Sequence, residues 1–390
     1  MKVLLCLLSD QHVPNLLSVH HYLPDHLVLV ESKSMNEKKV ASHFLSALKF
    51  GNLNYDDRHH VEPLETEDSL HSVRKALQTA YGRYPIGQWI ANLTGGTKPM
   101  GIATYEFFKA LGGKLVYTNF NRPERFIDIS TDLTEDCVYQ LPIKEFLAGY
   151  GFKLMISHDK LDKAERRAQE WAHSAKLLAL HTSEKDILKL GNEERKRARN
   201  KGIELSADKF NLPCDELRQI WLNGVTGRKL NKQEARFLTG GWLEVFVWDV
   251  LTRHRDGLGI WDVRLGLSVC RTGDESDNEL DVAFMQNQGL SMVECKSGSQ
   301  ENDVSGDVLY KVETIKRQFG ALRVGSILAT TSTNILDKDN KVKKSINMRA
   351  KNHNLLILAR DEIRDLAREP DNIATVRKLF GIKVQSESRT

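Results

Sequence analysis

The chain has 390 residues, which is long for one hydrophobic core, so two or more domains are expected. With 41% hydrophobic and 28% charged residues, its composition is that of an ordinary soluble globular protein. The net charge of +4 permits an anionic partner but does not predict one, because a nucleic-acid binder can gather its basic residues on a single face.

The cysteines argue against a structural zinc site or a disulfide framework. They lie far apart in the sequence, at Cys6, Cys137, Cys214, Cys270 and Cys295. A reduced, cytoplasmic protein is therefore expected. The apolar run "VLLCLLS" (3–9) is too short for a signal sequence, and no stretch approaches the roughly 20 apolar residues of a membrane span. We expect no association with a membrane.

Residues 1–150 alternate strand and helix patterns. Apolar runs predict strands at 3–9, 26–31, 88–93, 114–119 and 125–130. Helices are predicted at 34–50, 66–81 and 98–111. Continuously apolar strands that alternate with helices are typical of a parallel sheet covered on both faces, so we expect a doubly wound, Rossmann-like α/β domain.

Residues 151–235 differ in composition from the preceding part, because they are helical and highly charged. The run "NEERKRARNK" (192–201) is interpreted as the solvated face of a helix in preference to a nucleic-acid-binding patch. We expect this region to be a helical linker or connector.

Residues 236–390 carry a second α/β pattern. Helices are predicted at 241–254, 307–320 and 341–352, with a further helical segment at the C-terminus. Strands are predicted at 260–271, 324–331 and 355–360. Between them, "NELDVAFMQNQGLSMVECKSG" (278–298) predicts a β-hairpin whose apolar strands are interrupted by charges.

The turn of this hairpin fixes which charges meet. If Asn287 and Gln288 are the two loop residues, Asp281 lies opposite Glu294. A three-residue turn with Gly289 left-handed would shift the pairing by about one residue. Lys296 follows Glu294 by two positions, so both point to the same face of their strand.

Two facing carboxylates repel unless a cation lies between them. A Mg²⁺ or Mn²⁺ ion bound by Asp281 and Glu294, with the backbone carbonyl of Cys295 as a further ligand, answers that problem. Lys296 would then orient an attacking water or stabilise the charge that develops on a phosphorane. The alternative is an amphipathic hairpin with its acidic residues on a wet face.

Glu244, on the predicted helix 241–254, favours the metal site. Its helical neighbours three and four residues away are Gly240, Gly241, Val247 and Trp248, so none of them is basic. A carboxylate without a basic neighbour is better satisfied by a bound cation than by the helix itself.

The stretch "NLTGGTKPMG" (92–101) lies between a predicted strand and a predicted helix. Glycines let the backbone approach a ligand closely, and the N–H groups of a helix start favour an anion. The residues expected to bind such a ligand are Thr94, Gly95, Gly96, Thr97 and Lys98. The stretch is neither a Walker A loop nor a dinucleotide fingerprint, and taken alone it is more typical of a simple turn than of a ligand site.

The end of strand 3–9 supplies a second set of polar residues. In a doubly wound sheet this strand and strand 88–93 are neighbours, and ligands bind where their ends meet. Ser9, Asp10 and Gln11 are therefore expected to face the same crevice as the glycine loop, which favours a small anionic ligand.

Two resemblances follow from these motifs. Glu244, Asp281, Glu294 and Lys296 resemble the catalytic set of the PD-(D/E)xK nucleases, although Leu280 stands where the family name has proline. The Rossmann-like pattern with "LTGGTK" resembles the CARF domain (CRISPR-associated Rossmann fold). A CARF domain followed by a nuclease domain is similar to the nucleases of type III CRISPR defence that cyclic oligoadenylates activate.

The resemblance implies a specific activity. It implies three units, namely a CARF-like sensing domain (1–150), a helical connector (151–235) and a restriction-endonuclease-like domain (236–390). It further implies a homodimer that binds one cyclic oligoadenylate, cyclic tetra-adenylate by expectation, and then cuts single-stranded DNA or RNA, or nicks duplex DNA, with Mg²⁺ or Mn²⁺. Tyr310 and Lys311 are weaker candidates for contacting the scissile phosphate.

Two alternatives remain at this point. A constitutive restriction or repair nuclease would have the same chemistry without nucleotide sensing. A non-enzymatic nucleotide-sensing regulator would retain the hairpin only as a scaffold, which leaves its charges without a purpose.

Overall fold

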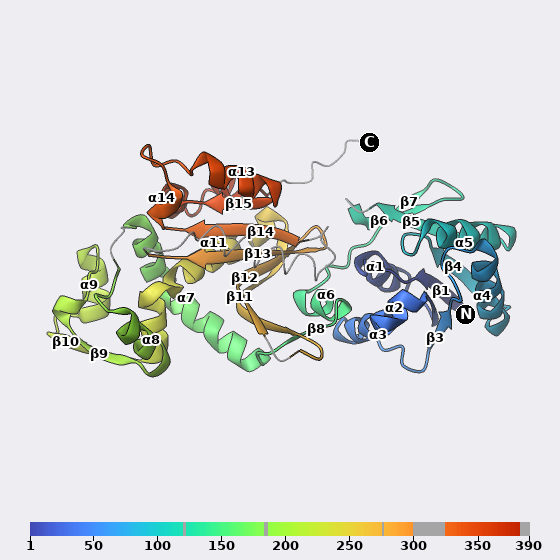
Figure 1. Ribbon diagram of the computed structural model, residues 1–390, viewed down its shortest axis with the longest axis horizontal. Coiled ribbons are helices and arrows are strands. Elements are labelled where there is room, and N and C mark those ends of the chain that lie inside the picture. The colour runs from blue at the N-terminus through green and yellow to red at the C-terminus, as the bar shows by residue number, and fades with distance from the viewer. Residues whose placement is uncertain (120–121, 183–185, 275–276, 299–323, 383–390) are drawn as a thin grey trace.

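The computed structural model describes residues 1–119, 122–182, 186–274, 277–298 and 324–382. Two α/β domains lie side by side along the long axis of the molecule, and a small helical module lies at the end farthest from the N-terminal domain (Figure 1). The predicted helix 307–320, with Tyr310 and Lys311, lies outside the described residues.

The N-terminal domain is built on a seven-stranded sheet of order β3-β2-β1-β4-β5-β6-β7. Its strands are β1 (Lys2–Leu7), β2 (His26–Glu31), β3 (His59–Pro63), β4 (Gln88–Asn92), β5 (Lys114–Asn119), β6 (Arg122–Asp128) and β7 (Thr134–Asp136). The first five are parallel, and β6 and β7 are antiparallel additions at one edge. The predicted doubly wound fold is confirmed.

Helices cover both faces of this sheet. They are α1 (Val13–Tyr22), α2 (Lys33–Glu37), α3 (Val40–Phe50), α4 (Leu70–Arg83) and α5 (Lys98–Ala110). Residues of α1 and α3 share one apolar cluster with β1 and β2, and residues of α4 and α5 share another. The sequence prediction missed α1 because nearly all of its residues are buried, so it shows no alternation of polar and apolar faces.

The C-terminal domain has a six-stranded mixed sheet of order β15-β14-β13-β12-β11-β8. Its strands are β8 (Phe152–Leu154), β11 (Ile260–Arg271), β12 (Asp277–Gln286), β13 (Gly289–Lys296), β14 (Val324–Thr330) and β15 (Leu355–Leu358). The helices are α7 (His158–Leu180), α11 (Trp242–Leu258), α13 (Lys344–Asn352), α14 (Arg360–Arg368) and α15 (Ile373–Leu379), with the short turn η3 (Thr333–Ile335).

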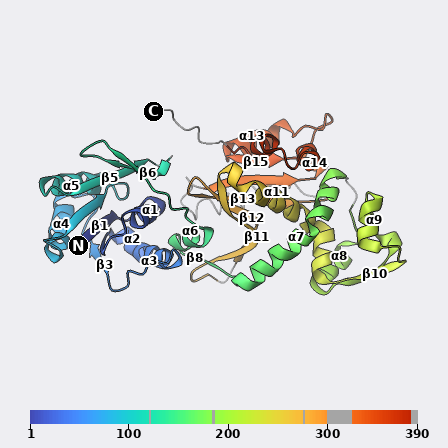
Figure 2. The same ribbon diagram turned by 180° about the vertical axis from the view of Figure 1, so that it is seen from behind.

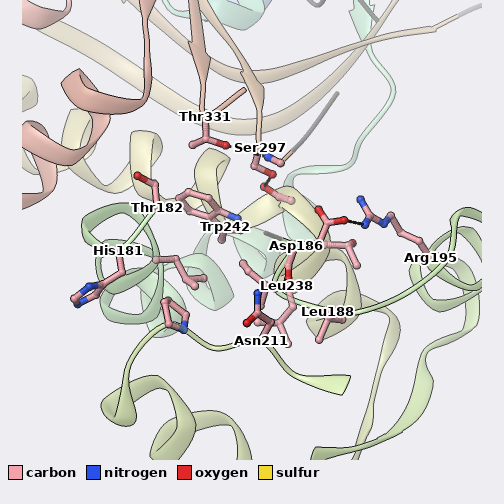
Figure 3. Close-up of a pocket in the computed structure, with 16 residues that line it drawn as sticks. His181, Thr182, Asp186, Leu188, Arg195, Asn211, Leu238, Trp242, Ser297 and Thr331 are labelled. Atoms are coloured by element: carbon pink, nitrogen blue, oxygen red, sulfur yellow. Dashed lines mark hydrogen bonds and ion pairs between the residues drawn. The ribbon is translucent and has the colours of Figure 1, made fainter. Parts of the chain in front are cut away.

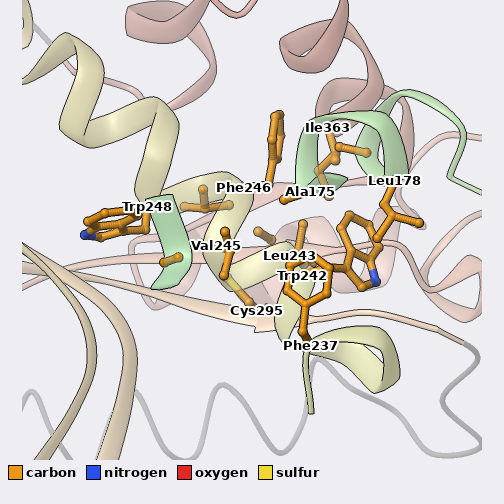
Figure 4. Packing of buried hydrophobic residues seen from close by; sticks show 14 of the residues in the cluster. Ala175, Leu178, Phe237, Trp242, Leu243, Val245, Phe246, Trp248, Cys295 and Ile363 are labelled. Atoms are coloured by element: carbon orange, nitrogen blue, oxygen red, sulfur yellow. The ribbon is translucent and has the colours of Figure 1, made fainter. Parts of the chain in front are cut away.

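One apolar cluster joins α7, α11 and α14 to the sheet. Figure 4 shows Trp242, Leu243 and Phe246 of α11 beside Leu178 of α7 and Ile363 of α14, with Cys295 of β13 beneath them. Because α11 is fastened to the sheet along its length, a side chain at its N-terminal end is held in a fixed place relative to β13.

Residues 151–235 are more than a linker. They hold α8 (Asn192–Lys201), η1 (Ala207–Lys209), α9 (Asp215–Leu222), α10 (Lys232–Arg236) and the ribbon β9 (Ile203–Ser206) with β10 (Gly227–Leu230). These pack around Trp171, Trp221 and Phe237. The region is less helical than the prediction of a helical linker or connector, because β9 pairs with β10 and β8 pairs with β11 in the C-terminal sheet.

The view from behind shows α6 (Ile143–Gly149) between the two domains (Figure 2). It packs against α3 of the N-terminal domain and lies beside β8 and β13. All five cysteines are free thiols. Within the described residues, no helix has the length and apolar character needed to cross a membrane.

Candidate functional site

The predicted hairpin forms with the predicted two-residue turn. Asn287 and Gln288 have φ of 49° and 58°, the left-handed pair that a type I′ turn requires. The strands pair from Gln286 with Gly289 to Val282 with Val293. This register excludes the three-residue turn. Asp281 and Glu294 occupy the next pair of positions on the two strands, after Val282 and Val293.

The strands separate where the charged residues begin. Beyond Val282 the ladder between β12 and β13 ends, and β13 continues to pair with β14, Glu294 with Leu328. Asp281 bridges the opening, since its Oδ2 accepts a hydrogen bond of 2.7 Å from the backbone N–H of Cys295. The carboxylate of Asp281 is thereby fixed against the strand that carries Glu294 and Lys296.

Lys296 is the cation of this group. Its Nζ lies 2.7 Å from Glu294 Oε1. Burial by itself lowers the pKa of Lys296, but the charges of Glu294, Asp281 and Glu244 outweigh it and raise the pKa above the ordinary value. Lys296 is therefore a permanent ammonium, which suits it to stabilise negative charge and not to act as a base.

Glu244 reaches the same place from α11. Burial raises the pKa of its carboxyl to about 8, and repulsion by Asp281 and Glu279 adds to the effect, while Arg199 and Lys296 oppose it. Glu279 was missed at the sequence level, although a signal for it exists. It stands two positions before Asp281, so the period of a strand places both on one face.

A helical bulge sets the start of α11 against β13. In η2 (Phe237–Gly241) the chain follows π-helical geometry, and Gly240 has φ of 150°. The Ser297 Oγ donates to the Gly240 carbonyl at 3.2 Å, and a Cβ on Gly240 would lie 3.0 Å from that Oγ. Glycine therefore permits the contact that joins the helix bearing Glu244 to the strand bearing Lys296.

Asp281, Glu294 and Glu279 carry more negative charge than the single ammonium of Lys296 balances, and Glu244 adds a fourth carboxyl group. A divalent cation fits this excess better than any protein group. The chemistry of the donors, carboxylate and backbone carbonyl oxygen, is that of Mg²⁺ or Mn²⁺. Among the described residues, no cluster of three or more His, Cys, Asp or Glu side chains is spaced to enclose a metal. By the chemistry of these oxygen donors, the residues fit an ion that water or substrate would help to coordinate.

These residues open onto one cleft of about 850 Å³. Its acidic side is formed by Glu244, Glu279 and Asp281, with Lys296 and the Cys295 backbone region beside them. Glu294 does not line the cleft, because its carboxylate is directed onto Lys296.

The opposite side of the cleft is basic. It is formed by one face of α8, with Asn192, Arg195, Lys196, Arg199 and Asn200. The helix is exposed, as its charge predicted, and one side of this exposed surface lines the cleft. Sequence reasoning missed these residues because more than 40 positions separate α8 from Glu244.

A smaller cavity of about 40 Å³ lies behind the cleft. Figure 3 shows the ion pair of Asp186 and Arg195 at its mouth, with Ser297 and Thr331 above. The backbone N–H of Gly298 donates to Thr331 Oγ1 at 2.9 Å. Arg195 is thus engaged by Asp186, in contrast to its neighbours on α8.

In the N-terminal domain, the glycine loop lies against the end of β1. A Cβ on Gly95 would be 2.0 Å from the Leu7 carbonyl oxygen, so only glycine fits there, and Gly96 has φ of 73°. Thr97 caps α5 and donates from Oγ1 to the Glu67 carbonyl at 3.0 Å. Lys98, the first residue of α5, is exposed.

Thr94 binds the glycine loop to β5, and two asparagines hold the ends of β1 and β4 together. Thr94 Oγ1 accepts from the Thr118 N–H at 3.0 Å. Asn92 donates to Asn15 Oδ1 at 3.0 Å, and Asn15 donates to the Leu7 carbonyl at 2.9 Å. Both asparagines are fully buried, so they join β4 to the start of α1.

The predicted residues after β1 form a short polar turn. Ser9 Oγ and the backbone N–H of Gln11 are 3.3 Å apart, and Asp10 forms an exposed ion pair with Lys38 at 2.7 Å. His12, which follows them, was missed by the sequence reasoning. Burial lowers its pKa to about 4, so it is a neutral ring. The structure thus brings the ends of β1 and β4 together at one edge, as predicted.

Comparison with known proteins gives two family matches. Residues 3–146 match the model of the Card1 CARF domain, and residues 231–375 match the model of the Card1-like endonuclease domain. No curated protein matches the chain.

Solved structures share the fold. Can2 from Sulfobacillus thermosulfidooxidans, solved in complex with cyclic tetra-adenylate, has a TM-score of 0.68 at 19% identity, over 97% of this chain and 99% of that one. Protein VC1899 from Vibrio cholerae has a TM-score of 0.72 at 16% identity, over 98% and 99%. A type III CRISPR defence DNA nuclease activated by cyclic oligoadenylate has a TM-score of 0.52 at 14% identity, over 90% of this chain and 51% of that one.

The two family matches agree with the structure described above. The CARF model matches the part with the Rossmann-like sheet, and the endonuclease model matches the part with the carboxylate-bearing hairpin. The chain thus combines a Card1-type CARF domain with a Card1-like endonuclease domain.

Proposed function

We propose that this protein is a metal-dependent endonuclease of type III CRISPR defence that cuts single-stranded DNA or RNA, or nicks duplex DNA, when cyclic tetra-adenylate binds. The observation that carries the proposal is the cleft in which Glu244, Asp281 and Lys296 meet opposite a basic helix. An excess of carboxylates beside a permanent ammonium is the arrangement that phosphodiester hydrolysis needs.

The residues have separate roles in this proposal. The proposed ligands of Mg²⁺ or Mn²⁺ are Asp281 and the Cys295 carbonyl, with Glu244 assisting. Glu294, predicted as a further ligand, does not line the cleft and pairs with Lys296 instead. When bound, the ion supplies Lewis-acid activation of the phosphodiester and of water. Lys296 stabilises the negative charge that develops at phosphorus, and Glu294 keeps its ammonium in place.

The proposed ligand of the CARF domain is cyclic tetra-adenylate. Can2, of the same fold, is described in complex with it. The proposed contacts are made by Ser9, Asp10 and Gln11 on one side and by the loop 94–98 on the other. A homodimer is proposed because a symmetric ring offers the same phosphates to both subunits.

The proposed route of activation runs through the segment before α6, where the two domains are in hydrogen-bond contact. Gln288, in the hairpin turn, donates to the Tyr139 carbonyl at 2.6 Å and accepts from the Leu141 N–H at 3.0 Å. Trp261 of β11 donates to the Leu141 carbonyl at 2.8 Å.

The other side of this segment is bound to α1. His20 Nε2 lies 2.7 Å from Glu145 Oε1, and its ring stacks on Tyr139 at 3.5 Å between centroids. Tyr139 also donates to Glu145 at 2.6 Å. Since α1 begins directly after Ser9–Gln11, a shift of α1 on ligand binding would reach the turn of the catalytic hairpin through Tyr139.

The domain limits and location complete the proposal. We propose a sensing domain at 1–150 and a nuclease domain at 236–390 that borrows β8 from the intervening region 151–235. The free cysteines support a reduced, cytoplasmic environment.

The direct test is cleavage of labelled single-stranded DNA and RNA by the full chain, with Mg²⁺ or Mn²⁺, with and without cyclic tetra-adenylate. Cleavage that needs both ligand and metal, and that Lys296→Ala abolishes, is expected. Full activity in Lys296→Ala would overturn the catalytic assignment. Cleavage without ligand that is unchanged by Lys98→Ala would favour the constitutive nuclease instead, and failure to bind divalent metal would favour the non-enzymatic regulator.

A further inference from the structure

One face of α8 is aimed at the catalytic residues. Asn192, Lys196 and Arg199 are spaced by four and three residues, so they lie on one side of the helix, and all three line the cleft. Arg197 and Lys201, on the same helix, do not line it. The helix therefore has two sets of basic residues. Only one set lines the cleft together with the acidic wall, which we define as Glu244, Glu279 and Asp281.

The cleft-facing residues are held in place by the packing of α8. Ala198 is fully buried in the same apolar cluster as Trp242 and Leu243 of α11. Arg236 of α10 donates from Nε to the Arg199 carbonyl at 2.9 Å. Glu194 accepts from the Gly191 N–H at 3.1 Å and closes the first turn. The backbone beside Lys196 and Arg199 is thus held by α10 and by the apolar cluster that contains α11.

These two side chains differ from the other cations around the cleft. Arg195 is paired with Asp186, and Lys296 with Glu294. For Lys196 and Arg199, the described part of the chain contains no ion pair or side-chain hydrogen bond, and both residues are exposed. The charge of Arg199 acts on Glu244, which lines the same cleft. Because neither Lys196 nor Arg199 is held in an ion pair within the described residues, both are suited to bind an anionic ligand.

We propose that Lys196 and Arg199 bind the phosphates that flank the scissile phosphate of a single-stranded nucleic acid, an inference that rests on the nuclease activity proposed above. The backbone of such a strand needs cations along its path, while its scissile phosphate lies on the acidic wall. Contacts of this kind position the strand without reading its bases.

The cleft favours one strand. Its volume of about 850 Å³ is comparable to that of a site for one small ligand, so it accommodates a few nucleotides. Asn192 and Asn200 lie on the same face and can donate to phosphate or sugar oxygens.

The test compares two double variants of the full chain with cyclic tetra-adenylate present. One is Lys196→Ala with Arg199→Ala, and the matched control is Arg197→Ala with Lys201→Ala, which removes the same charge from the same helix. Affinity for a fluorescent single-stranded oligonucleotide is measured by anisotropy in EDTA, over a series of salt concentrations, so that the strand is bound but not cut.

Loss of two phosphate contacts is expected to reduce the slope of log affinity against log salt by about 1.4 and to weaken binding roughly tenfold at about 0.1 M salt. The control is expected to keep the slope. In cleavage assays with metal, KM is expected to rise while kcat at saturating strand changes little. The exchange Lys196→Arg with Arg199→Lys should retain the slope.

The outcomes separate the inference from the function on which it rests. If the wild type cuts a strand but the first variant binds with an unchanged slope, the inference is wrong and the nuclease activity stands. If the control loses as much as the variant, the effect is one of overall charge, and the cleft face of α8 is not the binding surface. If the wild type neither binds nor cuts nucleic acid, both proposals fail.

Discussion

The catalytic hairpin and the glycine loop of the CARF domain hold their polar residues in different ways. In the hairpin, charged side chains bind one another or the adjacent strand, and Asp281 and Glu294 are only 9% and 8% exposed. In the loop, threonine hydroxyls bind backbone groups of their own domain, and Lys98 is exposed. The first site is assembled within one domain, whereas the second is a shaped backbone surface that an anionic ligand would complete.

The largest expected effect tests whether the hairpin is the assembled site. Asp281→Asn keeps an acceptor for the Cys295 N–H but removes the charge. We expect metal-dependent cleavage to fall by roughly 10²–10³-fold, the usual cost of losing one group that stabilises charge in the transition state. Asp277→Asn is the control, because Asp277 is exposed on the same strand outside the cleft. If Asp281→Asn and Asp277→Asn were equally active, the hairpin around Asp281 would not be the assembled catalytic site.

A second prediction tests whether the glycine loop is a shaped backbone. In Gly95→Ala the new Cβ meets the Leu7 carbonyl at 2.0 Å, which forces the loop away from β1. We expect a loss of about 1–3 kcal/mol in the free energy of unfolding, together with weaker ligand binding. Gly101→Ala, inside α5 with its nearest neighbour at 4.0 Å, should instead be neutral or stabilising. Thermal unfolding and calorimetric titration with cyclic tetra-adenylate measure both effects.

A third prediction concerns the link between the two regions. Gln288→Asn tolerates the left-handed turn but is too short to reach both Tyr139 and Leu141. We expect ligand-stimulated cleavage to fall about fivefold relative to unstimulated cleavage, since couplings between sites are typically worth 1–3 kcal/mol. Asn287→Gly preserves the turn and should leave stimulation unchanged. If Gln288→Asn left the ratio of stimulated to unstimulated cleavage unchanged, the segment 139–141 would not lie on the route of activation.

The smallest effect is one of pH. Because the pKa of Glu244 is raised to about 8, the folded protein holds a proton that the unfolded chain releases near its ordinary value. In EDTA, the stability of the protein should therefore decrease as the pH rises from about 4.5 to 8. Glu244→Gln should flatten this part of the curve. Adding Mg²⁺ should stabilise the wild type more at pH 8 than at pH 6, because the metal competes with the proton.

Local patterns carried much of the fold and part of the candidate site. The two-residue turn at Asn287 and Gln288 fixed the hairpin register, since strand pairing has a period of two. Helix α1 was missed because burial on all sides removes the periodic signal. Lys196 and Arg199 could not be placed in the cleft from the sequence, because their position depends on how α8 packs against α11, which no local pattern records. The contact of Gln288 with Tyr139 could not be predicted either, because it too depends on how distant parts of the chain pack together.

The strand β8 has a consequence for how the two domains can be separated. It contributes only Phe152–Leu154, but it covers the outer edge of β11 by pairing with Val269, Cys270 and Arg271. A fragment that begins at residue 236 would leave that edge as a row of unpaired N–H and C=O groups open to another chain. A fragment that begins at residue 231, where the family match begins, would lose β8 in the same way. A fragment that keeps this edge of β11 covered has to begin before residue 152, close to the segment that is held by the sensing domain.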